Sequence, residues 1–241
     1  MSKLIDTHFH LDFYKNHREL YEQINKAEQY TLCVTNSPGV YLSCKKIYPE
    51  TRYIKFALGF HPHEILKNKL SIKDFQLCMG KSIYIGEIGL DFSKDYMGSQ
   101  QIQISSFSSI IKYVQESNKL ASIHIRQAEY EAIEILEKLR PQKCIIHWFT
   151  GNEEQLQGLI KLGCYFSVNT YMVRNQSLIN KVKLIPTEKL LVESDGPFTK
   201  VNGYTFSPSL LNKAYEIIAK AMGVANLREV VFTNFNRLLT L

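Results

Sequence analysis

The sequence has few of the features that mark membrane, disulfide-rich or disordered proteins. No apolar run approaches the roughly 18 residues that a membrane-spanning helix needs. The five cysteines are odd in number and form no C-x-x-C pair, so we expect buried side chains in a reducing compartment. Charged residues make up 22% of the chain and hydrophobic residues 45%, a balance that excludes disorder and indicates a globular protein.

Two further motifs are missing. The N-terminus carries no basic stretch followed by an apolar leader, so we expect a cytoplasmic protein with no membrane partner. No Gly-x-Gly-x-x-Gly follows the first apolar run, which leaves the main competing fold, a doubly wound dinucleotide-binding sheet, with little support. The 29 Lys and Arg residues exceed the 23 Asp and Glu residues by 6. A surface with this positive charge tolerates or attracts polyanions, but it does not prove nucleic-acid binding.

Short apolar runs alternate with amphipathic segments along the whole chain. Eight such runs, each followed by a helix or a helix-length gap, predict an α/β protein with a (β/α)8 TIM barrel fold, a single domain over residues 1–241 and an extra C-terminal helix over 226–241. Asn152 and Ser207 are predicted N-caps, and Gly163 and Gly223 are predicted C-terminal stops. The predicted strands are 3–5, 31–35, 53–59, 82–86, 120–123, 143–146, 164–168 and 189–192, and the main predicted helices are 100–116, 129–139, 153–162 and 207–222.

Polar side chains gather where the apolar runs end. Of the seven histidines, only His17 falls in a helical stretch, and the carboxylates Glu87 and Asp195 also follow apolar runs. The carboxyl ends of the strands of a parallel barrel meet at one rim, so we expect these side chains to converge. The histidines at run ends are His8, His10, His61, His63, His124 and His147.

These residue types predict a metal site. Residues i and i+2 of a strand point the same way, so His8 and His10 can bind one ion together. Imidazole and carboxylate ligands suit Zn²⁺, Mn²⁺, Fe or Ni²⁺, and carboxylate-rich sites also take Mg²⁺. The donors exceed what one ion needs, and Glu87 could bridge two ions roughly 3.5–4 Å apart. A lone strand-end histidine is more often a core or surface residue, but so many at equivalent positions favour metal binding.

Six segments of the chain resemble the TatD family of metal-dependent deoxyribonucleases, a branch of the amidohydrolase-like barrels. The resemblance covers nearly the whole chain, and the ordered set of segments is more specific than any one of them. The segments are IDTHFHLD (5–12), GFHPH (59–63), GEIGLD (86–91), HIR (124–126), HWFTG (147–151) and ESDGP (193–197).

The resemblance implies a site with two divalent metal ions, Mg, Mn or Zn. It implies that His8, His10, Glu87 and Asp195 hold one ion and that Glu87, His124 and His147 hold the other. It also implies phosphate contacts from His61, His63 and Arg126. Independently, Arg126 lies two positions past His124 and carries a guanidinium fork that suits phosphate, although a salt bridge at the rim would also explain it.

Parts of the chain depart from the usual family pattern. Gln127 stands where an Asp is usual, and the segment after Asp195 lacks the usual Arg-Gly-Asn stretch. Trp148 and the segment 163–168 resemble the QatD-type nucleases of the bacterial antiviral Qat system, which implies other Qat components as partners. Aromatic residues near rim loops are candidates for stacking on bases, or for ordinary packing: Trp148, Tyr171, Tyr204 and Phe206.

The favoured hypothesis is a metal-dependent phosphodiesterase that hydrolyses DNA, with RNA as a further substrate, from an exposed single-stranded end. A two-metal-activated hydroxide would attack phosphorus, Glu87 and Asp195 would be the catalytic carboxylates, and Asp195 would take the proton of the nucleophile. Two rival hypotheses stay open: a related barrel hydrolase that acts on a phosphotriester, lactone or amide, and a binding subunit of an anti-phage defence complex.

Overall fold

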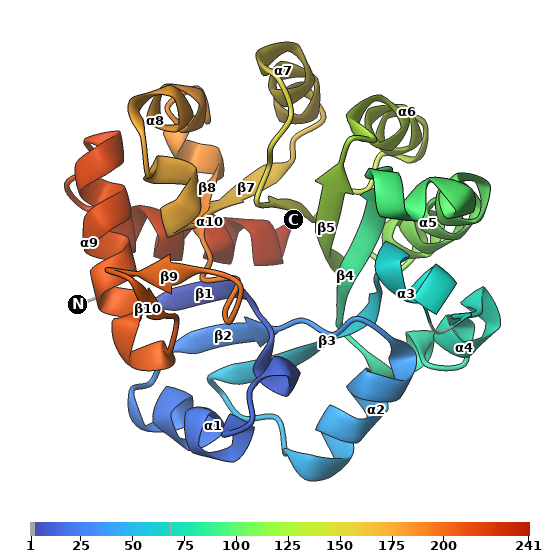
Figure 1. Ribbon diagram of the computed structural model, residues 1–241, viewed down its shortest axis with the longest axis horizontal. Coiled ribbons are helices and arrows are strands. Elements are labelled where there is room, and N and C mark those ends of the chain that lie inside the picture. The colour runs from blue at the N-terminus through green and yellow to red at the C-terminus, as the bar shows by residue number, and fades with distance from the viewer. Residues whose placement is uncertain (1–2, 68) are drawn as a thin grey trace. The chain divides into compact units, whose positions relative to one another are not determined.

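Strands and helices alternate along the chain in the computed structural model, which describes residues 3–67 and 69–241 (Figure 1). The eight main strands follow one another in chain order in the sheet, and the recorded neighbours pair in parallel. This arrangement confirms the predicted (β/α)8 TIM barrel fold class. The strands are β1 (Ile5–Phe9), β2 (Tyr30–Cys33), β3 (Ile54–Phe60), β4 (Tyr84–Asp91), β5 (Leu120–Arg126), β6 (Cys144–His147), β7 (Tyr165–Val168) and β8 (Leu190–Val192).

The helices agree closely with the amphipathic segments of the sequence. Helices α5 and α6 have the predicted bounds, and α10 is the predicted extra C-terminal helix. The helices are α1 (His17–Lys26), α2 (Pro38–Ile47), α3 (Pro62–Lys67), α4 (Ile72–Gln76), α5 (Gln100–Glu116), α6 (Glu129–Leu139), α7 (Glu153–Lys161), α8 (Gln176–Val182), α9 (Leu211–Met222) and α10 (Leu227–Thr240).

Helix ends mostly follow the predicted capping chemistry. Asn152 accepts a hydrogen bond from the Gln155 backbone in a reciprocal capping box, and Gly163 and Gly223 have the positive φ angles of helix stops. Ser207 does occupy an N-cap position, but that of a 3₁₀ turn over Pro208–Leu210 that precedes α9, and its hydroxyl makes no capping hydrogen bond. Its hydroxyl pairs with that of Ser209 instead.

The chain divides into two compact units, each assembled from separate segments. One comprises Met1–Cys33, Pro49–Lys55 and Phe166–Leu241. In it the C-terminal helices pack on the strands that carry polar residues: the Tyr215 hydroxyl of α9 donates to the Ile5 carbonyl at 2.7 Å, and the Asn234 amide of α10 donates to the Leu190 carbonyl at 2.8 Å. Helices α9 and α10 therefore anchor β1 and β8.

The other unit comprises Val34–Tyr48 and Phe56–Tyr165, and here β4 is the central element. Helix α5 packs against β4 and α6 packs against β5 (Figure 1). The Gln103 side chain of α5 accepts from the Asp91 amide at 2.8 Å and donates to the Asp91 carbonyl at 2.9 Å, so it fixes the carboxyl end of β4.

Several strands continue beyond their predicted ends. Strand β1 extends through His8, β5 through His124 and β6 to His147, while β4 runs past Glu87 to Asp91. The apolar runs stop earlier because inward-facing polar side chains replace aliphatic ones within the same strands. Glu87 therefore lies inside a strand rather than after it.

A short hairpin and five thiols complete the fold. Strands β9 (Lys200–Val201) and β10 (Tyr204–Thr205) pair antiparallel around Asn202 and Gly203, and this sheet was not predicted. All five cysteines are buried, which confirms their predicted burial. Among the described residues, no helix has the length and apolarity needed to cross a bilayer.

Candidate metal centre

The first cluster of donors lies within one unit, where β1 runs beside β8. The Thr7 hydroxyl donates to the Val192 carbonyl at 3.1 Å, and the Asp195 amide donates to the His8 carbonyl at 2.9 Å. These bonds bring Asp195 to His8 and His10. The two Nε2 atoms lie 3.2 Å apart, and they lie 3.7 and 3.4 Å from Asp195 Oδ1. All three side chains are buried.

Asp6, for which no role was predicted, supports this cluster. Its Oδ1 accepts hydrogen bonds from the His8 amide at 3.3 Å and from the Ser194 amide at 2.9 Å. Burial raises the pKa of Asp6 to about 7, against the opposing effect of these hydrogen bonds. Asp6 therefore ties the segment before His8 to the segment before Asp195.

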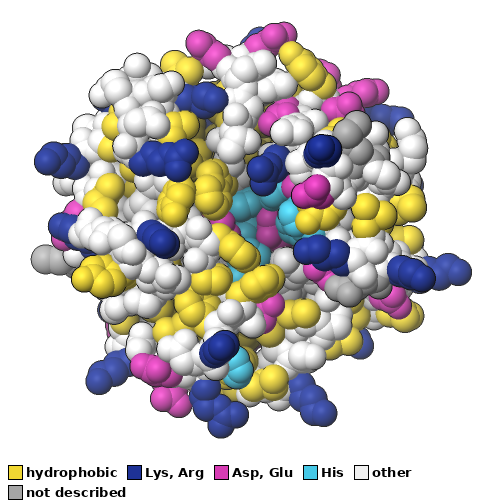
Figure 2. All heavy atoms as spheres, viewed as in Figure 1, with side chains coloured by type: hydrophobic (Ala, Val, Ile, Leu, Met, Phe, Trp, Pro, Cys, Tyr) yellow, Lys and Arg dark blue, Asp and Glu magenta, His cyan; other side chains and the backbone are white. Residues whose placement is uncertain are grey.

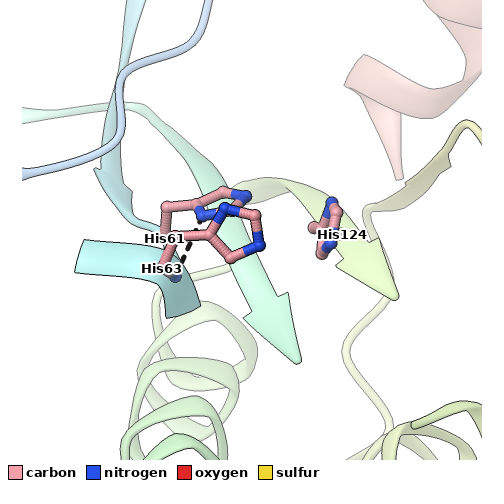
Figure 3. Close-up of side chains that lie close together, drawn as sticks. All are labelled: His61, His63 and His124. Atoms are coloured by element: carbon pink, nitrogen blue, oxygen red, sulfur yellow. Dashed lines mark hydrogen bonds between the residues drawn. The ribbon is translucent and has the colours of Figure 1, made fainter. Parts of the chain in front are cut away.

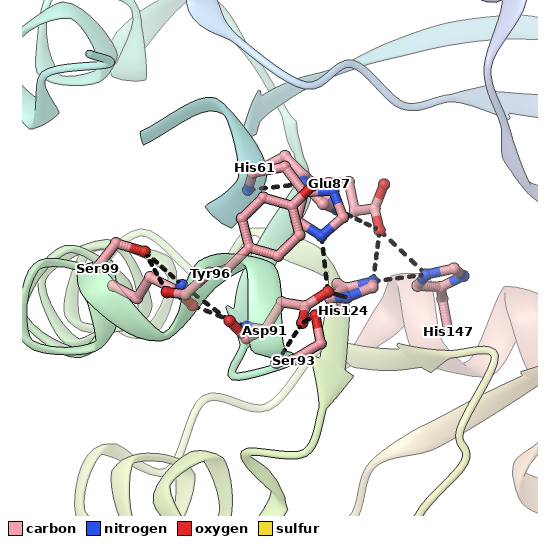
Figure 4. A network of polar contacts seen from close by, with 10 residues as sticks. His61, Glu87, Asp91, Ser93, Tyr96, Ser99, His124 and His147 are labelled. Atoms are coloured by element: carbon pink, nitrogen blue, oxygen red, sulfur yellow. Dashed lines mark hydrogen bonds and ion pairs between the residues drawn. The ribbon is translucent and has the colours of Figure 1, made fainter. Parts of the chain in front are cut away.

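The second cluster centres on Glu87 of β4, in the other unit (Figure 4). Glu87 Oε1 lies 3.2 Å from His61 Nε2, 3.0 Å from His124 Nδ1 and 3.0 Å from His147 Nε2. His61, expected to contact phosphate, thus lies against the same carboxylate oxygen as the two predicted ligands. Burial lowers the pKa of His61 to about 4 although Glu87 opposes the shift, so its imidazole is neutral at pH 7.

Asp91 is a functional candidate that the sequence analysis missed. Its Oδ2 lies 2.6 Å from His63 Nε2 and 3.2 Å from His124 Nε2, and its Oδ1 accepts from the Ser93 amide at 2.9 Å (Figure 4). Burial opposes ionisation, but the hydrogen bonds from His124, His63 and Ser93 outweigh it and hold the pKa of Asp91 well below its usual range. An ionised Asp91 therefore accepts from both histidines.

Ring packing completes the environment of His63 and His124. His63 stacks on Tyr96 with ring centroids 3.8 Å apart and an interplanar angle of 7°. His61, His63 and His124 face one another, and one ligand atom from each lies within 4.8 Å of the others (Figure 3). Burial lowers the pKa of His124, but its hydrogen bonds to Asp91 and Glu87 outweigh burial and raise it overall.

Glycine lets β4 approach β5 at this point. Gly89 pairs with His124 in the sheet register, and a Cβ atom on Gly89 would lie 1.9 Å from the His124 carbonyl oxygen. Its φ of +148° is also one that residues with side chains rarely adopt. Gly89 therefore permits the close strand contact that places His124 beside Glu87 and Asp91.

Two of the remaining predicted residues, Arg126 and Trp148, lie at strand ends. Arg126 ends β5 with an exposed guanidinium group, and Trp148 follows β6 with a half-buried ring and a φ of +38°. Of the other stacking candidates, Tyr204 is exposed, whereas Phe206 is buried against Phe9 and is a packing residue. Substrate contacts of Arg126 and Trp148 stay predictions.

The chemistry of these donors suits divalent cations. His8, His10 and Asp195 each offer one ligand atom, and these atoms lie within 4.8 Å of one another. Three is also the number of protein ligands at a typical catalytic zinc. Glu87, His124 and His147 also offer one carboxylate and two imidazoles. Imidazole and carboxylate together fit Zn²⁺ or Mn²⁺. A bridge by Glu87 to the first cluster stays a prediction.

Comparisons with known proteins agree with this chemistry. The family model described as TatD related DNase matches residues 5–240. The chain is 27% identical over 256 residues to the uncharacterized metal-dependent hydrolase YcfH of Escherichia coli K12, covering 98% of this chain and 95% of that protein. It is 28% identical over 183 residues to deoxyribonuclease Tat-D of Schizosaccharomyces pombe, covering 75% of this chain and 56% of that protein.

The fold has close counterparts among solved structures. The crystal structure of YJJV, a TatD homolog from Escherichia coli K12, superposes with a TM-score of 0.85 at 19% identity. That superposition covers 99% of this chain and 98% of the other.

Proposed function

Because the chain belongs to the TatD-related DNase family and is a metal-dependent hydrolase, we propose that it is a deoxyribonuclease that holds two divalent cations and acts as one barrel domain. The metal ligands in this proposal are those named from the resemblance: His8, His10, Glu87, His124, His147 and Asp195. The observation that carries the proposal is the convergence of imidazole and carboxylate atoms at 3.0–3.7 Å in each of two clusters. All of the proposed ligands are buried except His124, which is half-buried.

Burial of these donors supports the proposal. Burying a carboxylate among imidazoles costs free energy unless partners compensate it, and structural cores rarely need such groups. Asp6 accepts a hydrogen bond from the backbone amide of His8, and Asp91 accepts one from the ring of His124. These two carboxylates form a second layer around the proposed metal ligands. Carboxylates that orient metal-ligating histidines are a common part of metal sites.

When bound, divalent cations activate water as a nucleophile and neutralise charge on phosphoryl oxygens. Asp195, which lies beside His8 and His10, would orient the attacking water and accept its proton. The lowered pKa of His61 keeps its imidazole neutral at pH 7, where it lies against Glu87. Arg126 and His63 would bind the phosphate of the substrate.

The distribution of positive charge bears on how DNA would bind. Lysine and arginine side chains are scattered over the face shown in Figure 2 rather than gathered in one patch. The net charge of +6 provides weak general attraction to a polyanion, and the face in Figure 2 carries no continuous positive track. Recognition would depend on groups near the cleaved phosphate, such as Arg126 and Trp148.

The finer parts of the hypothesis belong to the same proposal. We propose cleavage from single-stranded ends, with RNA as a further substrate, and a cytoplasmic location. A role beside other Qat components in defence against phages rests on Trp148 and residues 163–168. To test that role, we would compare the survival of phage-infected cells that carry the wild type with that of cells that carry an Asp195→Asn variant. Equal survival would mean that defence does not need the hydrolase activity.

The direct test is cleavage of end-labelled single-stranded DNA by metal-stripped protein reloaded with Mn²⁺, Mg²⁺ or Zn²⁺. We expect cleavage only after reloading, and we expect its loss in a His124→Ala variant. His17→Ala is the matched control, because His17 begins α1 and lies outside both clusters. A phosphotriester and a lactone serve as rival substrates.

Absence of DNA cleavage under every metal loading would contradict the proposal. Cleavage of the phosphotriester or lactone alone would indicate the rival barrel hydrolase. Equal activity of the His124→Ala and His17→Ala variants would mean that the Glu87 cluster is not the active site.

A further inference from the structure

Two exposed phenylalanine rings stand beside the His8–His10–Asp195 cluster. Phe13 ends the 3₁₀ turn that follows β1, and Phe198 lies in the segment after β8. Their side chains are 45% and 49% exposed, whereas His10 is buried. Each ring centroid lies 5.3 Å from that of His10, and the two rings are 5.1 Å apart. The three rings therefore meet edge to face, with half of the phenylalanine pair in water.

Backbone hydrogen bonds hold the pair in place. The Phe13 amide donates to the His10 carbonyl at 3.3 Å, and the Phe198 amide donates to the Asp195 carbonyl at 2.8 Å. The His10 amide donates to the Gly196 carbonyl at 3.0 Å, which joins the two segments. Both rings are thus fixed to the residues that we propose as metal ligands, and the exposed surface is not a loose loop.

The surroundings suit a nucleotide. An apolar ring that leaves half of its surface in water forgoes much of the stabilisation that full burial of such a side chain provides. Exposed lysines follow each ring by two residues, Lys15 after Phe13 and Lys200 after Phe198. The pair therefore presents an apolar aromatic surface directly beside the polar cluster.

We propose that Phe13 and Phe198 bind an unpaired nucleobase of the nucleotide whose phosphate is cleaved. The inference rests on the proposed function, since the phosphate must lie at the metal ligands. Every base has a π-face, so stacking on such rings is tolerant of sequence. A base inside a duplex is already stacked on both faces and must leave the helix first, which costs free energy. The pair therefore selects unpaired ends of the substrate.

A purely structural role for the rings predicts different behaviour. If Phe13 and Phe198 only support His10, their removal weakens metal binding and affects all substrates equally. If they bind a base, their removal matters only when the substrate carries that base. Substrates with and without the base separate the two roles.

The experiment compares the wild type with a Phe13→Ala/Phe198→Ala variant on two single-stranded oligonucleotides. One is intact, and the other carries a stable abasic residue at the cleaved nucleotide. Stacking of one base is worth roughly 1–3 kcal/mol, so we expect removal of the base to raise the wild-type KM roughly 5- to 150-fold and to change the variant's KM little. A Phe13→Leu/Phe198→Leu variant keeps the apolar bulk if the alanine variant does not fold.

Tyr130→Ala is the matched control, because Tyr130 is a 60% exposed aromatic residue on α6. Metal content is measured for every variant. Equal losses on the intact and the abasic oligonucleotide, or lower metal content as the whole effect, would overturn the inference.

A binding measurement keeps the inference separate from catalysis. Stacking quenches the fluorescence of 2-aminopurine, so wild-type protein should quench a single-stranded oligonucleotide that carries it, and the double variant should not. Equal quenching by both proteins would refute the nucleobase site. Failure of the wild type to cleave any DNA, with quenching that depends on the two phenylalanines, would refute the proposed nuclease function alone.

Discussion

Replacing Asp91 with asparagine tests whether this carboxylate orients the histidines of the Glu87 cluster. The substitution keeps the size of the side chain but removes its charge. The Asp91 carboxylate accepts from His63 at 2.6 Å and from His124 at 3.2 Å. Hydrogen bonds to a charged acceptor are about twice as strong as neutral ones, so each contact should lose about 1 kcal/mol. Loss of the His124 contact should weaken metal binding, and loss of the His63 contact should weaken substrate binding.

We therefore expect Asp91→Asn to weaken Mn²⁺ binding about 5-fold and to lower kcat/KM about 30-fold. The second value lies within the roughly 10- to 100-fold range known for partners of metal-ligating histidines, and the first lies just below it. Titration calorimetry of the metal-stripped protein gives the first value, and steady-state cleavage of single-stranded DNA gives the second. Asp95→Asn is the matched control, because Asp95 is exposed and loses the same charge. A folded Asp91→Asn protein with wild-type metal affinity and kcat/KM would refute the reasoning.

Three further predictions concern stability. Gly89→Ala should cost more than about 3 kcal/mol in urea unfolding, since the new Cβ would lie 1.9 Å from the His124 carbonyl oxygen, while Gly98→Ala, with open space, should cost little. Glu193→Gln should cost about 1–3 kcal/mol, because the buried carboxylate accepts from both Asn169, at 2.9 Å, and Ser167, and an amide keeps only one acceptor oxygen for these two donors; unchanged thermal unfolding would contradict this. The pKa of His61 is lowered to about 4 in the folded protein, so the unfolded chain takes up a proton first as pH falls. The free energy of unfolding of the metal-stripped protein should therefore fall by up to roughly 3 kcal/mol between pH 6.5 and 4, and a His61→Gln variant should lack this loss.

The alternation of apolar runs and amphipathic segments sufficed to predict the fold class. Buried parallel strands are apolar on both faces, so strands such as β3 and β6 are visible as short aliphatic runs. Helices α5 and α6 were predicted with their observed bounds because their apolar faces repeat at the helical period. These are local signals that need no knowledge of tertiary contacts.

The errors occurred where polar residues replace aliphatic ones inside the fold. Strand β4 was predicted to end at residue 86, since Glu87 interrupts the apolar run, yet the strand continues to Asp91. Asp91 follows Glu87 by four residues, an even spacing that places two strand residues on the same face. That spacing was available as a signal for Asp91. The hairpin of β9 and β10 was missed although Asn202-Gly203 is the dipeptide that favours such turns.

The donors could be chosen from sequence, but their partners could not. His8 and His10 were expected to act together, and their Nε2 atoms do lie 3.2 Å apart. No pattern in the sequence indicated that His61 would face Glu87 or that Phe13 and Phe198 would meet over His10, because those contacts join segments that only the fold brings together.

The most direct test of the account is whether these donors bind metal. Elemental analysis of reloaded protein, together with an anomalous difference map from crystals soaked in MnCl₂, would locate the ions. The account predicts two peaks at bonding distance, about 2.0–2.2 Å from the donor atoms, one at His8, His10 and Asp195 and one at Glu87, His124 and His147. Folded protein that shows no peak at either cluster would contradict it.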